Sequence, residues 1–150
     1  MPGKRIVLVA SPGGHRTELL ELAEAFAGHE THCFTYAPAS SEGFEGLHVF
    51  PNLAQKPWTF PVTFFRLFRL LRQLRPVCLM STGGELAIPA FLIGKFVFRT
   101  RLIFIECSAQ VQTPSLTGRV LCRFCDLFFV QWRSLLKTYG KRARYAGGLI

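Results

Sequence analysis

Apolar positions recur with two different periods along this chain, and the succession of the two periods predicts an α/β domain. Short β-branched apolar runs are typical of buried strands, whereas apolar residues at every third or fourth position are typical of helices. The predicted strands cover residues 5–10, 31–36, 47–50, 77–81, 102–106, 127–130 and 143–146. The predicted helices cover residues 15–27, 60–75, 86–98, 115–125 and 133–139. We therefore predict a Rossmann-like, mostly parallel sheet of six or seven strands with helices on both faces.

The first predicted strand ends abruptly in the turn Ser11-Pro12-Gly13-Gly14-His15. Glycine lets the backbone approach a ligand closely, and the first amides of the following helix point outward at the positive end of its dipole. We predict that Ser11, Gly13 and Gly14 bind an anion, and a phosphate fits best. His15 can exchange a proton near neutral pH and is the first candidate for a catalytic base. In the alternative interpretation, His15 only caps the helix.

Two more polar turns follow predicted strands, after residues 77–81 and 102–106. Ligands of parallel α/β sheets bind beyond the carboxyl ends of the strands, so all three turns should meet on one rim. The additional candidates for acceptor and phosphate binding are Thr82, Gly83, Gly84, Glu85 and Ser108. Glu106 is a second candidate for catalysis, because a carboxylate on this rim could accept the same proton as His15.

An ordinary dinucleotide site is not expected at the first turn. Such a site requires three glycines in G-x-G-x-x-G order and an acidic residue after the second strand. The chain has only Gly13 and Gly14, and its second predicted strand runs into Ala37-Pro38-Ala39. The sequence thus argues against NAD, and we expect no cofactor.

Length and composition predict a single domain over residues 1–150. Hydrophobic residues make up 49% of the chain, but no apolar stretch reaches eighteen residues and the N-terminus does not resemble a signal peptide. The five cysteines are odd in number and lie mostly in apolar segments, which is typical of reduced core cysteines. Cys122 and Cys125 form an isolated C-x-x-C, and there is no DxD motif, so no metal site is expected.

Charge is distributed unevenly along the chain. Residues 1–56 carry a net charge of −2 and residues 57–150 one of +11, which predicts an anionic partner for the C-terminal part. The segment Trp58–Arg75 combines large apolar residues with regularly spaced arginines and contains no acid, as interfacial membrane helices do. The expected membrane-binding residues are Trp58, Phe64, Phe65, Arg66, Phe68, Arg69, Arg72 and Arg75. Alternatively, this is a crossover helix packed on the sheet with a solvated basic face. No nucleic-acid-binding motif is present.

Five motifs occur in an order that resembles a known family. They are Ser-Pro-Gly-Gly-His-x-x-Glu-Leu at 11–19, Ser-Thr-Gly-Gly at 81–84, Phe-Ile-Glu at 104–106, Pro-Ser-Leu-Thr-Gly-Arg at 114–119 and Val-Gln-Trp at 130–132. Together they resemble the PssD/EpsE/CpsF-type proteins of bacterial polysaccharide biosynthesis. Those proteins are similar to the membrane-anchor subunit of the eukaryotic two-chain transferase that adds the second GlcNAc to dolichol diphosphate-GlcNAc. More distantly, the chain resembles the N-terminal half of MurG.

The resemblance implies a split GT-B glycosyltransferase in which this chain is the N-terminal, acceptor-binding half. Its partner would be a second small Rossmann-like subunit that binds the nucleotide sugar. Together they would transfer a sugar, with inversion, to a polyprenyl-diphosphate-linked saccharide in exopolysaccharide or capsule assembly. The chain would associate peripherally with the cytoplasmic face of the plasma membrane. Departures from the family are Gln110, where many relatives have arginine, and the pair Cys107-Ser108.

Two other functions stay open at this point. One is a non-catalytic membrane adaptor that recruits and activates the donor-binding subunit. The other is a phosphate-binding or nucleotide-binding Rossmann protein unrelated to glycans. The basic segment Trp58–Arg75 fits the transferase and the adaptor but not the third function, and a catalytic role of His15 would separate the first two.

Overall fold

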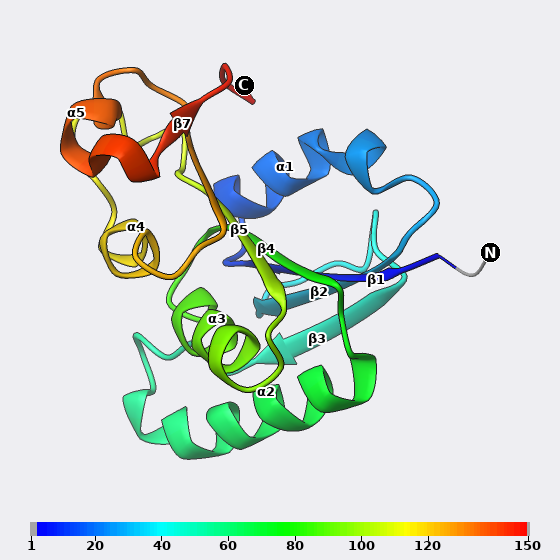
Figure 1. The fold of residues 1–150 in the computed structure, drawn as a ribbon. Helices are drawn as coiled ribbons and strands as arrows, with labels where there is room; N and C mark the ends of the chain where they lie inside the picture. Colours follow the sequence, from blue (N-terminus) through cyan, green and yellow to red (C-terminus); the bar gives the residue numbers. More distant parts are fainter. Residues whose placement is uncertain (1–2, 150) are drawn as a thin grey trace.

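A computed structural model describes residues 3–149. Its strands form one seven-stranded sheet with the order β3-β2-β1-β4-β5-β6-β7 (Figure 1). The strands are β1 (Arg5–Ala10), β2 (Glu30–Tyr36), β3 (Gly46–Phe50), β4 (Cys78–Gly83), β5 (Arg101–Ile105), β6 (Leu127–Val130) and β7 (Arg144–Tyr145). Every neighbouring pair is parallel. The predicted Rossmann-like sheet is confirmed. The chain leaves β1 for β2 on one side and resumes at β4 on the other, so β1 and β4 flank the topological switch point, where such folds bind ligands.

The helices agree with the sequence prediction in number and order but are shorter. They are α1 (Gly14–Glu21), α2 (Phe60–Leu74), α3 (Ala87–Phe96), α4 (Leu116–Leu121) and α5 (Leu135–Tyr139). Three 3₁₀ turns accompany them, η1 (Ala23–Phe26), η2 (Pro57–Thr59) and η3 (Gly140–Arg142). The predicted continuous helix over 15–27 is therefore wrong. The Leu22 amide bonds to the Leu19 carbonyl, which tightens the last turn of α1 into 3₁₀ geometry.

The two faces of the sheet are covered unequally. Val7 and Val9 of β1 point into the larger core, which α2, α3, α4 and α5 close. Ile6, Leu8 and Ala10 point to the other face, where α1 and η1 cover them through Leu19 and Phe26. Figure 1 shows α1 on one side of the sheet and α2 and α3 on the other. This arrangement explains why β1 is an almost continuous apolar run rather than an alternating one.

An irregularity at the end of β4 shapes the rim. Val9 pairs with Ser81, but the next residue, Ala10, pairs with Gly83, so Thr82 is an extra residue on β4. Bulges of this kind re-aim side chains and are common next to functional sites. Here the Thr82 hydroxyl donates to the His15 carbonyl at 2.5 Å and fastens β4 to the start of α1.

No helix in the described range 3–149 combines the length and the apolar character that crossing a bilayer requires.

Candidate functional site

The turns after β1 and β4 lie against each other at the switch point. Gly13 precedes α1 with a φ of 86°, and a Cβ on Gly13 or Gly14 would meet only open space. Gly83 has a φ of 140°, and a Cβ there would lie 2.5 Å from the His15 Cε1 atom. The second glycine turn is thus required for the close approach of the imidazole. Gly13 and Gly14 are exposed at the start of α1, as an anion site at a helix N-terminus needs.

Glu18 is a buried carboxylate one turn after His15 in α1. Its side chain is 1% exposed. Its Oε1 atom accepts hydrogen bonds from the Ser108 amide at 2.9 Å and the Ser108 hydroxyl at 2.5 Å. The Cys107 thiol lies 3.6 Å from the same oxygen. Burial raises the pKa of that thiol, which keeps it protonated as a donor.

Gln131 links the Glu18 carboxylate to the backbone of Glu106. Its Nε2 atom donates to Glu18 Oε2 at 3.3 Å and to the Glu106 carbonyl at 3.0 Å. Its Oε1 atom accepts from the Leu149 amide at 2.8 Å, so the segment after β7 is tied to the same network. Neither Glu18 nor Gln131 is among the site residues predicted from the sequence. Both lie in quoted motifs, and the three-residue spacing of His15 and Glu18 places them on one side of a helix.

The geometry does not support the expected catalytic role of Glu106. This residue is 1% exposed, and its carboxylate accepts from the Cys107 amide, the Ser115 amide and the Tyr139 hydroxyl. Burial, together with this bond to Glu106, raises the pKa of Tyr139. Glu106 therefore fastens the loop before α4 to α5 and is placed in the interior, not on the open rim.

The other predicted binding residues fall into two groups. The hydroxyls of Thr82 and Ser108 are committed to protein partners, His15 and Glu18 respectively, so neither is a free phosphate donor. Ser11, Gly13, Gly14 and Gly84 keep some exposure at the junction of the two turns. Glu85 is exposed and lies 3.5 Å from the Tyr36 hydroxyl at the end of β2.

The predicted membrane segment forms η2 and α2 and has two apolar sides. Leu67 and Leu71 are buried and pack in the larger core under the sheet. The helix is therefore also the crossover helix of the alternative interpretation. The outward side of η2 and α2 carries the apolar residues Trp58 (73% exposed), Phe60, Val62, Phe64 and Phe65 (68% exposed).

Two of the expected membrane residues have structural partners. Arg66 donates to the Val49 carbonyl at 2.6 Å and lies over the Phe50 ring, which anchors α2 to the edge strand β3. Phe68 packs against Phe98 and the core. Arg69, Arg72 and Arg75 are exposed. Of the expected membrane-binding residues, Phe68 and Arg66 therefore make contacts within the protein.

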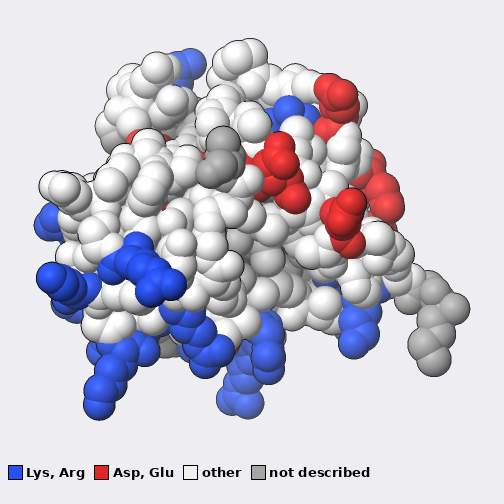
Figure 2. Space-filling model, turned by 90° about the horizontal axis from the view of Figure 1, so that it is seen from above, with Lys and Arg blue, Asp and Glu red and all other residues white. Residues whose placement is uncertain are grey.

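Charge is segregated in space as well as in sequence. Figure 2 shows the molecule from above, with most Lys and Arg of that face along the left and lower edges and Asp and Glu toward the right. A cavity of about 510 Å³ between α4 and α5 collects three arginines, Arg119, Arg123 and Arg142. On the face that Figure 2 shows, Lys and Arg thus gather on a basic side, away from most of the Asp and Glu.

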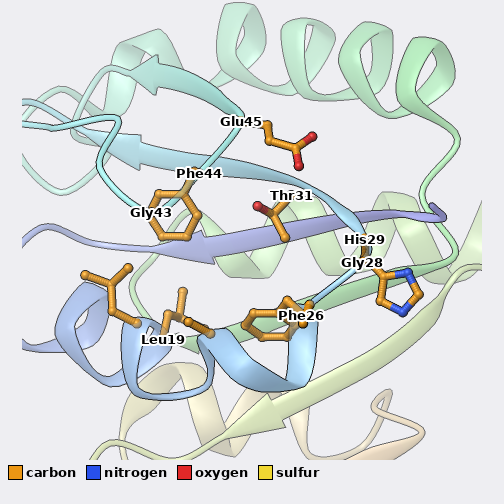
Figure 3. A pocket seen from close by; sticks show the side chains of 11 residues that line it. Leu19, Phe26, Gly28, His29, Thr31, Gly43, Phe44 and Glu45 are labelled. Atoms are coloured by element: carbon orange, nitrogen blue, oxygen red, sulfur yellow. The ribbon is translucent and has the colours of Figure 1, made fainter. Parts of the chain in front are cut away.

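The pocket in Figure 3 lies away from the three turns. It has a volume of about 230 Å³ between α1, η1 and β2, and its lining includes Leu19, Phe26, Thr31 and Phe44. None of the candidate residues of the rim contributes to it. This pocket is therefore separate from the candidate site at the switch point.

Comparison with known proteins identifies the family. Residues 47–149 match the family described as "Oligosaccharide biosynthesis protein Alg14 like". The chain belongs to this family. Among curated relatives, the mouse "UDP-N-acetylglucosamine transferase subunit ALG14" is 24% identical over 97% of the chain and 83% of the relative. The protein of the same name from Yarrowia lipolytica is 36% identical over 61% of the chain and 44% of the relative.

Solved structures with the same fold include two larger enzymes. Acinetobacter baumannii MurG superposes with a TM-score of 0.69 at 16% identity, over 85% of this chain and 41% of MurG. Staphylococcus aureus MnaA in complex with UDP gives a TM-score of 0.69 at 10% identity, over 97% of this chain and 45% of MnaA. The chain spans less than half the length of either structure. These likenesses confirm the fold, and the narrower assignment to the PssD/EpsE/CpsF type stays a prediction.

Proposed function

We propose that this Alg14-like chain is the acceptor-binding, membrane-associating subunit of a two-component, inverting glycosyltransferase. The donor would be a nucleotide sugar, and the names of the relatives point to UDP-N-acetylglucosamine. The acceptor would be a polyprenyl-diphosphate-linked saccharide. The observation that carries the proposal is the junction of the two glycine turns with His15 at the switch point between β1 and β4.

The rim offers a place for the acceptor diphosphate and for a proton acceptor. The open amides at the start of α1 suit a phosphate, because they donate hydrogen bonds at the positive end of the helix dipole. His15 lies beside them and can take the proton of the attacking sugar hydroxyl. The buried network of Glu18, Ser108 and Gln131 holds α1 against the loop after β5. This network fixes the position of His15 without itself reaching the substrate.

The outward side of η2 and α2 supports peripheral membrane binding. Exposed aromatic side chains can enter the acyl boundary while Arg69, Arg72 and Arg75 meet lipid phosphates. This surface would hold the subunit on the bilayer that contains its lipid-linked acceptor. The expected cytoplasmic face of the plasma membrane and the assembly of exopolysaccharide or capsule rest on the family resemblance.

Reconstitution tests the proposal. The purified chain alone should show no transfer above background, because the reacting groups are held in one geometry only when both halves are present. Addition of a donor-binding partner should restore transfer to a short polyprenyl-diphosphate-GlcNAc. Robust turnover by the isolated chain would exclude the two-component assignment.

A non-catalytic membrane adaptor is the second candidate function, and the exposed aromatic side of α2 supports it as well as it supports the acceptor-binding subunit. The two functions differ in what they require of the rim residues. An adaptor tolerates substitution of His15 as long as the partner is still recruited, whereas the acceptor-binding subunit does not.

A further inference from the structure

Three residues of different metal-binding chemistry meet beneath the rim. One ligand atom each from His15, Glu18 and Cys107 lies within 4.8 Å of the other two. His15 and Glu18 come from consecutive turns of α1, and Cys107 comes from the loop after β5. The set consists of an imidazole, a carboxylate and a thiol, which are the three kinds of ligand that Zn²⁺ takes in proteins.

The spacing of two of these ligands already matches a metal site. Zn–S bonds of about 2.3 Å and Zn–O bonds of about 2.0 Å place sulfur and oxygen about 3.5 Å apart at a tetrahedral angle. The Cys107 Sγ atom lies 3.6 Å from Glu18 Oε1. The His15 ligand atom lies within 4.8 Å of both, so a side-chain adjustment of the imidazole would complete the three-ligand set.

The charge balance of Glu18 is a second, independent observation. A buried carboxylate is normally paired with a cation or bound to a metal. Glu18 is 1% exposed, yet its partners are the neutral groups of Ser108, Cys107 and Gln131. Within residues 3–149, no ion pair with an arginine, lysine or histidine reaches it. Among the described residues, the buried carboxylate of Glu18 therefore lacks the cationic partner that a metal ion would supply.

The imidazole supplies a third observation. The Nδ1 atom of His15 is buried and has no hydrogen-bond partner in the described part of the chain. An unsatisfied buried nitrogen is uncommon and calls for a partner. The bonds from Ser108 and Gln131 to Glu18 would serve as the outer shell that orients a metal-bound carboxylate.

We propose that His15, Glu18 and Cys107 bind a transition-metal ion of the Zn²⁺ class, with a fourth position open to the rim. Binding replaces the thiol proton with the metal, so one proton is released for each ion bound. The sequence-based expectation of no metal site overlooked this set because 89 positions separate Glu18 from Cys107. A metal-bound imidazole cannot accept a proton, so the ion should also block sugar transfer. This consequence rests on the proposed function, whereas the metal site itself does not.

Cobalt titration of the isolated full chain tests the site without any transfer assay. After treatment with a chelator, Co²⁺ should bind at one ion per chain and give a thiolate-to-cobalt charge-transfer band, and Zn²⁺ should displace it. In the Cys107→Ser variant the band should disappear and the affinity should fall by at least about tenfold, since even outer-shell changes cost that much. Ser keeps a hydroxyl donor for Glu18, so the fold should persist by circular dichroism.

Matched variants separate this site from the other cysteines. Cys122→Ser and Cys125→Ser remove the C-x-x-C of the α4 region and should leave the cobalt band unchanged. His15→Ala should weaken binding as Cys107→Ser does. Unchanged cobalt binding in both Cys107→Ser and His15→Ala, or loss of the band in the Cys122 and Cys125 variants alone, would overturn the proposal. Because no partner or acceptor is present, either result is independent of the transfer experiment.

Discussion

The rim at the switch point and the outward side of α2 depart from an ordinary soluble surface in opposite ways. Behind the rim, polar and charged groups are turned inward: Glu18 and Glu106 are each 1% exposed and bonded to their neighbours. On η2 and α2, large apolar groups are turned outward, with Trp58 at 73% and Phe65 at 68% exposure. Buried polar groups and exposed apolar patches both depart from the usual distribution of side chains in soluble proteins, and both carry information about function.

The contrast shows how the two regions divide the proposed work. Buried polar networks rigidify the segments they connect, because each buried group loses stabilising hydrogen bonds if its partners move. The rim therefore suits chemistry, which requires fixed geometry. The aromatic side of α2 has no such constraint, and it suits a fluid partner such as a bilayer. Substitutions that harm catalysis should thus leave membrane binding intact, and the reverse should also hold.

The largest expected effect is on the chemistry of the rim. His15→Ala in the reconstituted pair should lower the maximal rate by at least about 100-fold, the lower range of general-base assistance. Initial rates at saturating donor and acceptor would measure it. Liposome binding of the variant should equal that of the wild type.

His15→Gln provides the matched control for this variant. It retains a hydrogen-bond donor for a phosphate but cannot act as a base near neutral pH. If His15 only orients the acceptor diphosphate, His15→Gln should keep most of the maximal rate and change mainly the acceptor KM. A base role is refuted if both variants keep substantial maximal rates.

The second effect concerns α2 and the bilayer. Replacing Arg69, Arg72 and Arg75 with Gln should reduce binding to anionic liposomes by about 100-fold, since each basic residue near such a surface contributes about 1 kcal/mol. Arg66 should be left in place, because its bonds to β3 serve the fold. Sedimentation with vesicles at two salt concentrations would measure the change.

Two companion variants sharpen this test. Trp58→Ser with Phe65→Ser removes exposed apolar area and should weaken binding even at high salt, where charge attraction is screened. Removing Lys137, Lys141 and Arg144 takes away the same charge elsewhere on the surface. If that triple variant loses as much binding as the α2 variant, the basic side as a whole attracts the membrane and α2 has no special role.

The sequence predicted the sheet well because its signals are local. The strand over 5–10 and the strand over 127–130 coincide with β1 and β6, since β-branched and aromatic runs between turns admit few other structures. It also predicted that the turns after β1, β4 and β5 would meet, because carboxyl ends of parallel strands share one edge. The break after α1 escaped prediction, because periodicity does not separate a 3₁₀ turn from a continued helix.

Whether a given side chain faces the core or the solvent was harder to predict from the sequence. Glu106 follows a buried strand in the same way as a catalytic carboxylate would, but its role is set by Ser115 and Tyr139, which are distant in sequence. On α2, both the buried Leu67 stripe and the exposed Phe65 side are apolar, so periodicity could not tell which one faces the sheet. Tertiary contacts decide both cases.

The third effect is on stability and tests the structural role of Glu106. Tyr139→Phe removes the hydroxyl that donates to this buried carboxylate and should lower the free energy of unfolding by about 1–3 kcal/mol. Thermal denaturation should show a decrease of about 2–4 °C for each kcal/mol. Tyr145→Phe, at an exposed tyrosine of β7, is the control and should change little. Equal melting temperatures in all three proteins would show that Glu106 is not held by this bond.

The smallest effect lies where α2 meets the edge strand β3. Burial, with His32 and Arg66 nearby, lowers the pKa of His48 below its ordinary 6.5. His32 faces it at 3.3 Å and is bonded in turn to Glu30, which pairs with Arg5. The folded state therefore prefers neutral His48, whereas the unfolded chain takes up a proton at about pH 6.5. This contribution to stability is complete above that pH and decreases as the pH falls through 6.5 toward the lower folded value.

Urea denaturation of wild type and His48→Gln at about pH 7.5 and pH 5.5 isolates this contribution. Gln does not titrate, so the stability of the variant should fall less between the two pH values, while carboxylate effects common to both proteins cancel in the difference. The wild type should therefore lose its advantage at the lower pH. An identical pH dependence in both proteins would show that α2 and β3 leave His48 as free to bind a proton in the folded state as in the unfolded chain. In that case neither burial nor the charges of His32 and Arg66 would distinguish the folded environment of His48 from the unfolded one.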